Sequence, residues 1–163
     1  MVDTGKVQDR RKLRYLSIDE LLADIDRIEN SDAAGTLRRT GNWTAGQAFG
    51  HLASWMNFAY EGFPTRPPWP IRMILRFFFR KKYLRDGMPA GVRIPGAADG
   101  TYAVQVMSTQ EGALMLRKAL LRLKSGEPPK FHSPAFGPMT LEERIALNLR
   151  HAELHLSFLH PSP

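Results

Sequence analysis

The chain has 163 residues, of which 43% are hydrophobic and 24% charged, and this size and balance fit one soluble globular domain with a proper core. It has no cysteine, which excludes disulfides, thiolate metal ligands and a protein-borne thiol nucleophile. The formal net charge is +7, which favours nucleic acid, anionic lipid or an acidic small molecule as a partner without choosing among them.

Residues 1–16 are polar and basic, and we expect them to form a basic N-terminal arm, either loose or packed on the surface. No apolar stretch follows the basic residues, so we do not expect a signal peptide. Arg72, Arg76 and Arg80 interrupt the most apolar segment, which argues against a membrane span. The expected location is therefore the cytoplasm.

Four segments begin with the pattern of a capping box, a serine or threonine followed three residues later by glutamate or glutamine, and continue with apolar residues at helical spacing. They predict helices over 17–30, 44–61, 108–124 and 140–160. Glycine and proline follow the second and third helices, and Pro161 ends the fourth. In the third helix the residues available for burial are Leu114, Leu116, Ala119, Leu120 and Leu123.

Residues 63–107 form a long crossover rich in proline and glycine, with a short helix predicted over 71–85. This short helix carries aromatic residues among many arginines and lysines. It has two interpretations: a basic amphipathic segment that binds a membrane or nucleic acid, or a lid whose aromatic side chains plug the fold while its arginines stay in water. We favour the lid. A crossover of this length itself indicates a function.

Four long helices with two short connections and one long one predict an all-α fold. We expect a four-helix bundle with a long crossover between helices 2 and 3, formed by residues 17–160 as a single domain. The sequence contains neither a glycine-rich phosphate loop nor a zinc-protease or serine-hydrolase signature.

Three histidines form a candidate metal site. His151 and His155 lie four residues apart on the last predicted helix, so their imidazoles can point to one place. His51 lies on the inward side of the second helix, where burial favours the neutral imidazole that binds metals. The alternatives are a solvated pair on a helix edge and a hydrogen-bonded core histidine. Three nitrogen ligands with an open coordination position are typical of catalytic rather than structural metal sites.

Four further residues are candidates for contacts with a substrate or with the histidines. Gln47 and Asn148 lie one turn from His51 and His151, where their amides can reach the site. His132 lies in the loop before the last helix, and Trp55 lies on the inward side of the second helix.

Several short stretches resemble a known family. They are 44–52 (TAGQAFGHL), 84–91 (LRDGMPAG), 132–140 (HSPAFGPMT) and 151–156 (HAELHL), and together with their spacing they cover most of residues 15–160. In these stretches the chain is similar to the DinB/YfiT-like superfamily and, within it, to the DUF1569 branch. The sequence departs from relatives that carry a second histidine just before the last ligand, since Leu154 occupies that position.

The resemblance implies a DinB-like four-helix bundle in which His51, His151 and His155 bind a divalent metal, with zinc or nickel expected. The superfamily includes thiol-dependent enzymes, among them bacillithiol transferases and mycothiol-dependent isomerases. We therefore expect a small-molecule substrate and, if the protein is an enzyme, a metal-dependent transferase or hydrolase that uses a low-molecular-weight thiol.

The alternatives are a non-enzymatic module that binds nucleic acid or anionic membrane through the basic crossover, and a bundle that has lost its activity. The resemblance makes the crossover a shared family feature, so we expect neither nucleic acid nor membrane as a partner. The oligomeric state stays open, with a homodimer among the alternatives.

Overall fold

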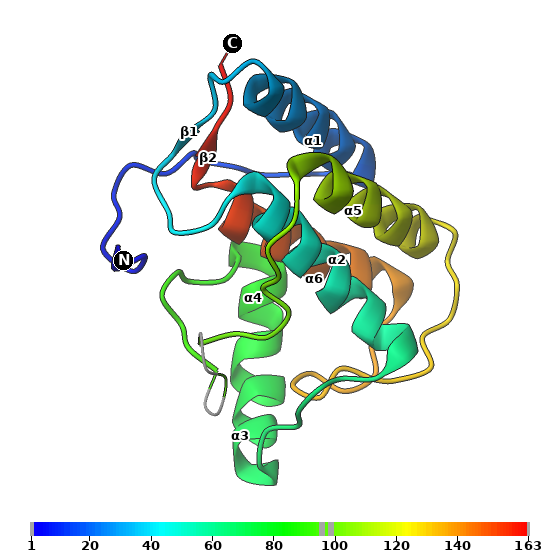
Figure 1. The fold of residues 1–163 in the computed structure, drawn as a ribbon. Coiled ribbons are helices and arrows are strands. Elements are labelled where there is room, and N and C mark those ends of the chain that lie inside the picture. The colour runs from blue at the N-terminus through cyan, green and yellow to red at the C-terminus, as the bar shows by residue number, and fades with distance from the viewer. Residues whose placement is uncertain (1, 95–96, 98–99, 163) are drawn as a thin grey trace.

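The computed structural model describes residues 2–94, 97 and 100–162 and is mostly helical, as predicted. Figure 1 shows the arrangement of its elements. The helices are α1 (Ile18–Ala33), α2 (Ala45–Glu61), α3 (Trp69–Ile74), the π-helix η1 (Leu75–Phe79), α4 (Arg80–Asp86), α5 (Thr109–Lys124) and α6 (Leu141–Leu156). Two short strands, β1 (Arg38–Arg39) and β2 (Leu159–His160), pair in an antiparallel manner.

The predicted caps start all four long helices, and three of the capping boxes are complete. Thr44, Ser108 and Thr140 each accept a hydrogen bond from the backbone N–H three residues on, and the side chain of that residue accepts one from the backbone N–H of the cap. At α1 only half of the box forms. Ser17 accepts from the Glu20 backbone, but the Glu20 carboxylate accepts from the backbone N–H of the preceding residue, Leu16.

The four long helices contribute to one buried hydrophobic core. The contact between α2 and α5 is the most extensive and depends on glycine, because a Cβ on Gly112 would lie 2.6 Å from the backbone oxygen of Gly46. In α5 the predicted core residues are buried except Leu114, which is 55% exposed, and Ala113 faces the core instead.

The N-terminal segment packs on the fold, and Arg11 and Tyr15 of this segment contact a buried carboxylate. Arg11 binds the fully buried carboxylate of Asp24 with both terminal nitrogens, at 2.9 and 2.7 Å, and donates to the carbonyl of Leu156. The Tyr15 hydroxyl also binds Asp24, at 2.5 Å, and Tyr15 is 4% exposed. The segment thus connects α1 with the end of α6.

The last helix ends earlier than predicted. It stops at Leu156 with Ser157 as its C-cap, and residues 159–160 pair with β1 rather than continuing the helix. A proline disfavours helical backbone angles at the residue before it, so Pro161 prevents His160 as well as itself from continuing the helix. Leu159 is still buried, but from a strand.

The predicted helix over 71–85 is found as α3, η1 and α4, which project away from α1 and α5 (Figure 1). None of the residues 69–86 is buried, and Phe77 and Phe78 are 64% and 75% exposed. These two aromatic side chains therefore do not plug the fold as the lid interpretation requires, whereas Tyr83 is half-buried and packs against Phe136, as that interpretation expects. No helix in the described part of the chain has the length and apolar character needed to cross a membrane.

Candidate metal centre

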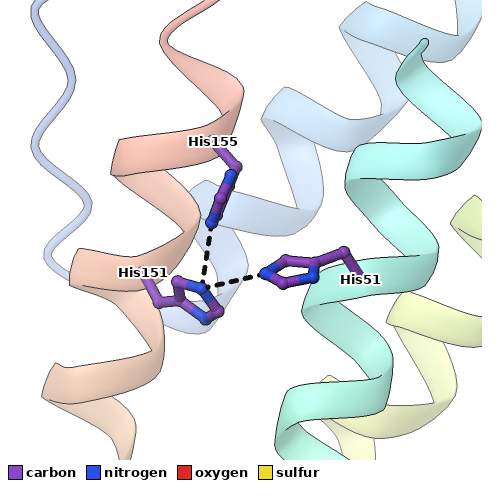
Figure 2. Close-up of side chains that lie close together, drawn as sticks. All are labelled: His51, His151 and His155. Carbon is purple, nitrogen blue, oxygen red and sulfur yellow. Dashed lines mark hydrogen bonds between the residues drawn. The ribbon is translucent and has the colours of Figure 1, made fainter. Parts of the chain in front are cut away.

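Three imidazoles meet between α2 and α6 (Figure 2). His51 comes from α2, and His151 and His155 come from successive turns of α6. The Nε2 atom of His151 lies 3.3 Å from Nε2 of His51 and 3.0 Å from Nε2 of His155. One nitrogen from each of the three rings lies within 4.8 Å of the other two. The spacing on α6 and the inward face of α2 predicted this convergence.

A backbone carbonyl from the crossover orients His51. Its Nδ1 lies 2.9 Å from the oxygen of Tyr102, and a carbonyl only accepts, so Nδ1 carries the proton. The Nε2 atom of His51 then has a free lone pair directed at the other two rings. Sequence reasoning missed Tyr102, because a backbone group in an irregular segment leaves no pattern.

Two tryptophans enclose the imidazoles. Trp43 stacks on His155 with ring centroids 4.8 Å apart and an interplanar angle of 13°, and its ring lies 4.9 Å from that of His51. Trp55 lies 6.0 Å from the rings of both His51 and His151. Trp43 was not among the predicted site residues, although its place directly before the Thr44 cap is a usual position for an apolar contact with the helix.

Burial keeps the three imidazoles neutral. It lowers the pKa of His51 to about 4, against a smaller opposite effect of the hydrogen bond to Tyr102. Burial also lowers the pKa of His151 and of His155 well below the ordinary value, and the neighbouring imidazoles add to the effect. Each ring therefore offers a lone pair at neutral pH, which is the form that a metal requires.

The donor set fits a divalent metal ion. Nitrogens bound tetrahedrally at about 2.1 Å from zinc lie about 3.4 Å from one another, close to the two measured separations. Within the described ranges, no other group of three or more histidine or acidic side chains brings its ligand atoms within 4.8 Å of one another. The group includes no carboxylate, so the protein could supply three ligands to such an ion.

A large cavity reaches the imidazoles. Its volume is about 1110 Å³, and His151 and His155 lie in its wall together with both tryptophans. Most of the other lining side chains are apolar, including Phe63, Phe131, Phe136, Leu147 and Phe158. The space beside the histidines is thus wide enough for a small organic molecule and mostly apolar.

The four other predicted residues, Gln47, Trp55, His132 and Asn148, all line this cavity. None of them makes a hydrogen bond to the three imidazoles. The Gln47 side-chain oxygen accepts from the backbone of Thr44 at 3.0 Å, and the Asn148 amide donates to the carbonyl of Arg144 at 2.8 Å. The indole N–H of Trp55 is buried and has no acceptor.

Comparison with known proteins identifies the family. Neither the curated proteins nor the solved structures include a match to this chain. A family model described as "Protein of unknown function (DUF1569)" matches residues 7–162, nearly the whole chain, and this span contains all three histidines and both tryptophans. The chain therefore belongs to the DUF1569 family.

Proposed function

We propose that the protein is a metalloprotein of DinB-like architecture, with α1, α2, α5 and α6 as its four-helix bundle and His51, His151 and His155 as ligands of zinc or nickel. The observation that carries the proposal is the contact of the Nε2 atoms at 3.3 and 3.0 Å. Each neutral imidazole offers one lone pair, and a cation can accept lone pairs from all three Nε2 atoms at once.

The cavity supports a small-molecule substrate and an external thiol, because the chain has no cysteine of its own. His51, His151 and His155 would hold a divalent ion, which would supply a Lewis acid able to lower the pKa of a thiol or water. The carbonyl of Tyr102 and the ring of Trp43 hold His51 and His155 in orientation. The apolar walls exclude water from a bound ligand. We propose thiol transfer as the reaction class, with hydrolysis as the alternative.

Metal analysis tests the proposal. Protein purified without a histidine tag is expected to contain one equivalent of divalent metal by elemental analysis, and His151→Ala and His155→Ala are each expected to lose it. The matched control is His132→Ala, since His132 lines the same cavity outside the cluster and its removal leaves all three ligands in place. Wild-type protein that stays metal-free after incubation with zinc at neutral pH contradicts the proposal.

A second candidate function is favoured by the exposed rod of α3, η1 and α4. It leaves large apolar side chains in solvent, namely Trp69, Ile71, Met73, Ile74, Phe77 and Phe78. Between Glu61 and Asp86 the chain carries seven arginines and lysines and no acidic residue. Segments that bind anionic lipid surfaces insert apolar side chains into the membrane and hold basic side chains against the lipid headgroups. We propose that this rod docks on an anionic lipid surface.

Lipid explains this surface better than the alternatives. Nucleic acid matches the charge but does not bury aliphatic side chains such as Ile71 and Met73, and a second copy of the rod would bring like charges together.

Sedimentation with vesicles of phosphatidylcholine, with and without phosphatidylserine, tests the proposal that the rod docks on anionic lipid. Binding only to the anionic vesicles is expected, with loss on joint Phe77→Ser and Phe78→Ser change. Leu121→Ser, at a similarly exposed site on α5, is the control. Binding to duplex DNA but not to vesicles contradicts the proposal.

A further inference from the structure

Arg144 is a buried cation in the wall of the cavity. It lies on α6 two turns before His151, on the same helix face, and is 9% exposed. One terminal nitrogen donates to the carbonyl of Glu127 at 3.0 Å. The other terminal nitrogen, Nη1, is buried and has no hydrogen-bond partner.

The charge of Arg144 has no direct counter-ion in the described part of the chain, since no carboxylate oxygen lies within 4.0 Å of it. The side chain of Glu127 is engaged with Arg122, whose Nε lies 2.8 Å away. Arg150 on the same helix differs in this respect, because it is similarly buried at 8% exposure but pairs with the Glu153 carboxylate at 2.9 Å. A buried guanidinium without an anion lowers the stability of the fold, and binding of an anionic ligand would compensate its charge.

The buried side-chain polar atoms that lack a partner and belong to residues lining the cavity are both donors. Four buried side-chain nitrogens of the described residues lack partners, and those of Trp55 and Arg144 belong to residues that line the cavity. A ligand that complements these walls must therefore present acceptors, and beside a guanidinium a charged acceptor is favoured. One terminal nitrogen of Arg144 already donates to the backbone carbonyl of Glu127, which leaves fewer donors for a ligand and suits a singly charged group rather than a phosphate dianion.

We propose that Arg144 binds a carboxylate of the ligand whose thiol reaches the three histidines. The inference rests on the proposed metal centre. Seven residues of helix separate Arg144 from His151, so the two ends of the site lie about 10 Å apart along α6. The ligand class is therefore an elongated thiol acid with an apolar middle, which suits a cavity whose lining is mostly apolar.

Cobalt substitution gives a readout that does not depend on turnover. Cobalt(II) bound by the histidines absorbs visible light, and binding of a thiol adds a sulfur-to-cobalt charge-transfer band. The probes are mercaptohexanoic acid and its uncharged counterpart mercaptohexanol. The acid is expected to bind about ten- to a hundredfold more tightly, as charged hydrogen bonds do. Mercaptoacetic acid, whose carboxylate cannot span the distance, is expected to show no dependence on Arg144.

Two variants locate the effect. Arg144→Met is expected to bind cobalt and both thiols while losing the preference for the acid, and Arg93→Met, at the other arginine in the wall, is expected to keep it. Equal affinity of wild-type protein for acid and alcohol overturns the inference even if Arg144→Met does not fold. A preference lost in Arg93→Met instead also overturns it. Failure to bind cobalt at all refutes the metal centre, which is a separate result.

Discussion

The stability of the metal-free protein is expected to fall between pH 6.5 and 4 because of His51. Burial lowers the pKa of this imidazole from 6.5 to about 4 in the folded state. Over this range the unfolded chain takes up a proton at His51 while the folded chain does not, so the free energy of unfolding decreases as the pH falls. The loss is about 2 kcal/mol at pH 5 and about 3 kcal/mol at pH 4, and it becomes complete below pH 4.

Urea unfolding at a series of pH values measures this loss, with His51→Gln as the comparison because glutamine does not titrate. Glu153 acts with the opposite sign, since burial raises its pKa and the folded state then holds the extra proton. That contribution is present in both proteins and cancels in their difference. The contributions of His151 and His155 largely cancel as well, because burial, the main cause of their lowered pKa, is kept in His51→Gln. Wild-type protein should lose about 3 kcal/mol more than His51→Gln between pH 7 and 4. Parallel stability curves would refute the reasoning.

Three further predictions concern stability. Gly46→Ala is expected to lower the free energy of unfolding in urea by about 3 kcal/mol, because its Cβ would meet the backbone carbonyls of Met107 and Ser108. The control Gly35→Ala should lower it by about 1 kcal/mol, because that position has open space but a φ of 68°. Equal losses would contradict the close approach at Gly46. Asp24→Asn is expected to cost about 3 kcal/mol and to lower the melting temperature by about 10 °C, because Arg11 loses its buried partner. Zinc at a hundredfold excess over its dissociation constant should stabilise wild-type protein by about 2.7 kcal/mol and a His151→Ala variant hardly at all.

Local signals in the sequence were reliable guides to the helices. The capping boxes at Thr44, Ser108 and Thr140 depend on only four consecutive residues, so they could be recognised without the rest of the fold. The meeting of the three imidazoles followed from helical spacing on α6 and the apolar face of α2. That they hold a metal remains a prediction.

Features set by tertiary contacts could not be predicted in the same way. Leu114 fits the apolar period of α5 but is exposed, because the close contact of Gly112 with Gly46 turns the neighbouring Ala113 inward. The C-terminal residues leave the helix to pair with β1, whose two arginines carry no strand signal. The carbonyl of Tyr102 reaches His51 from an irregular segment, and only the path of the backbone determines where it arrives.

The pairing of β1 with β2 has a consequence for synthesis of the chain. Arg38 is synthesised 122 residues before its partner His160. The separation is still longer for Arg11 and Leu156, whose carbonyl accepts from Arg11. Contacts of such long range form late in folding. Until then a nascent chain holds an unpaired backbone edge at β1 and an unattached basic N-terminal segment.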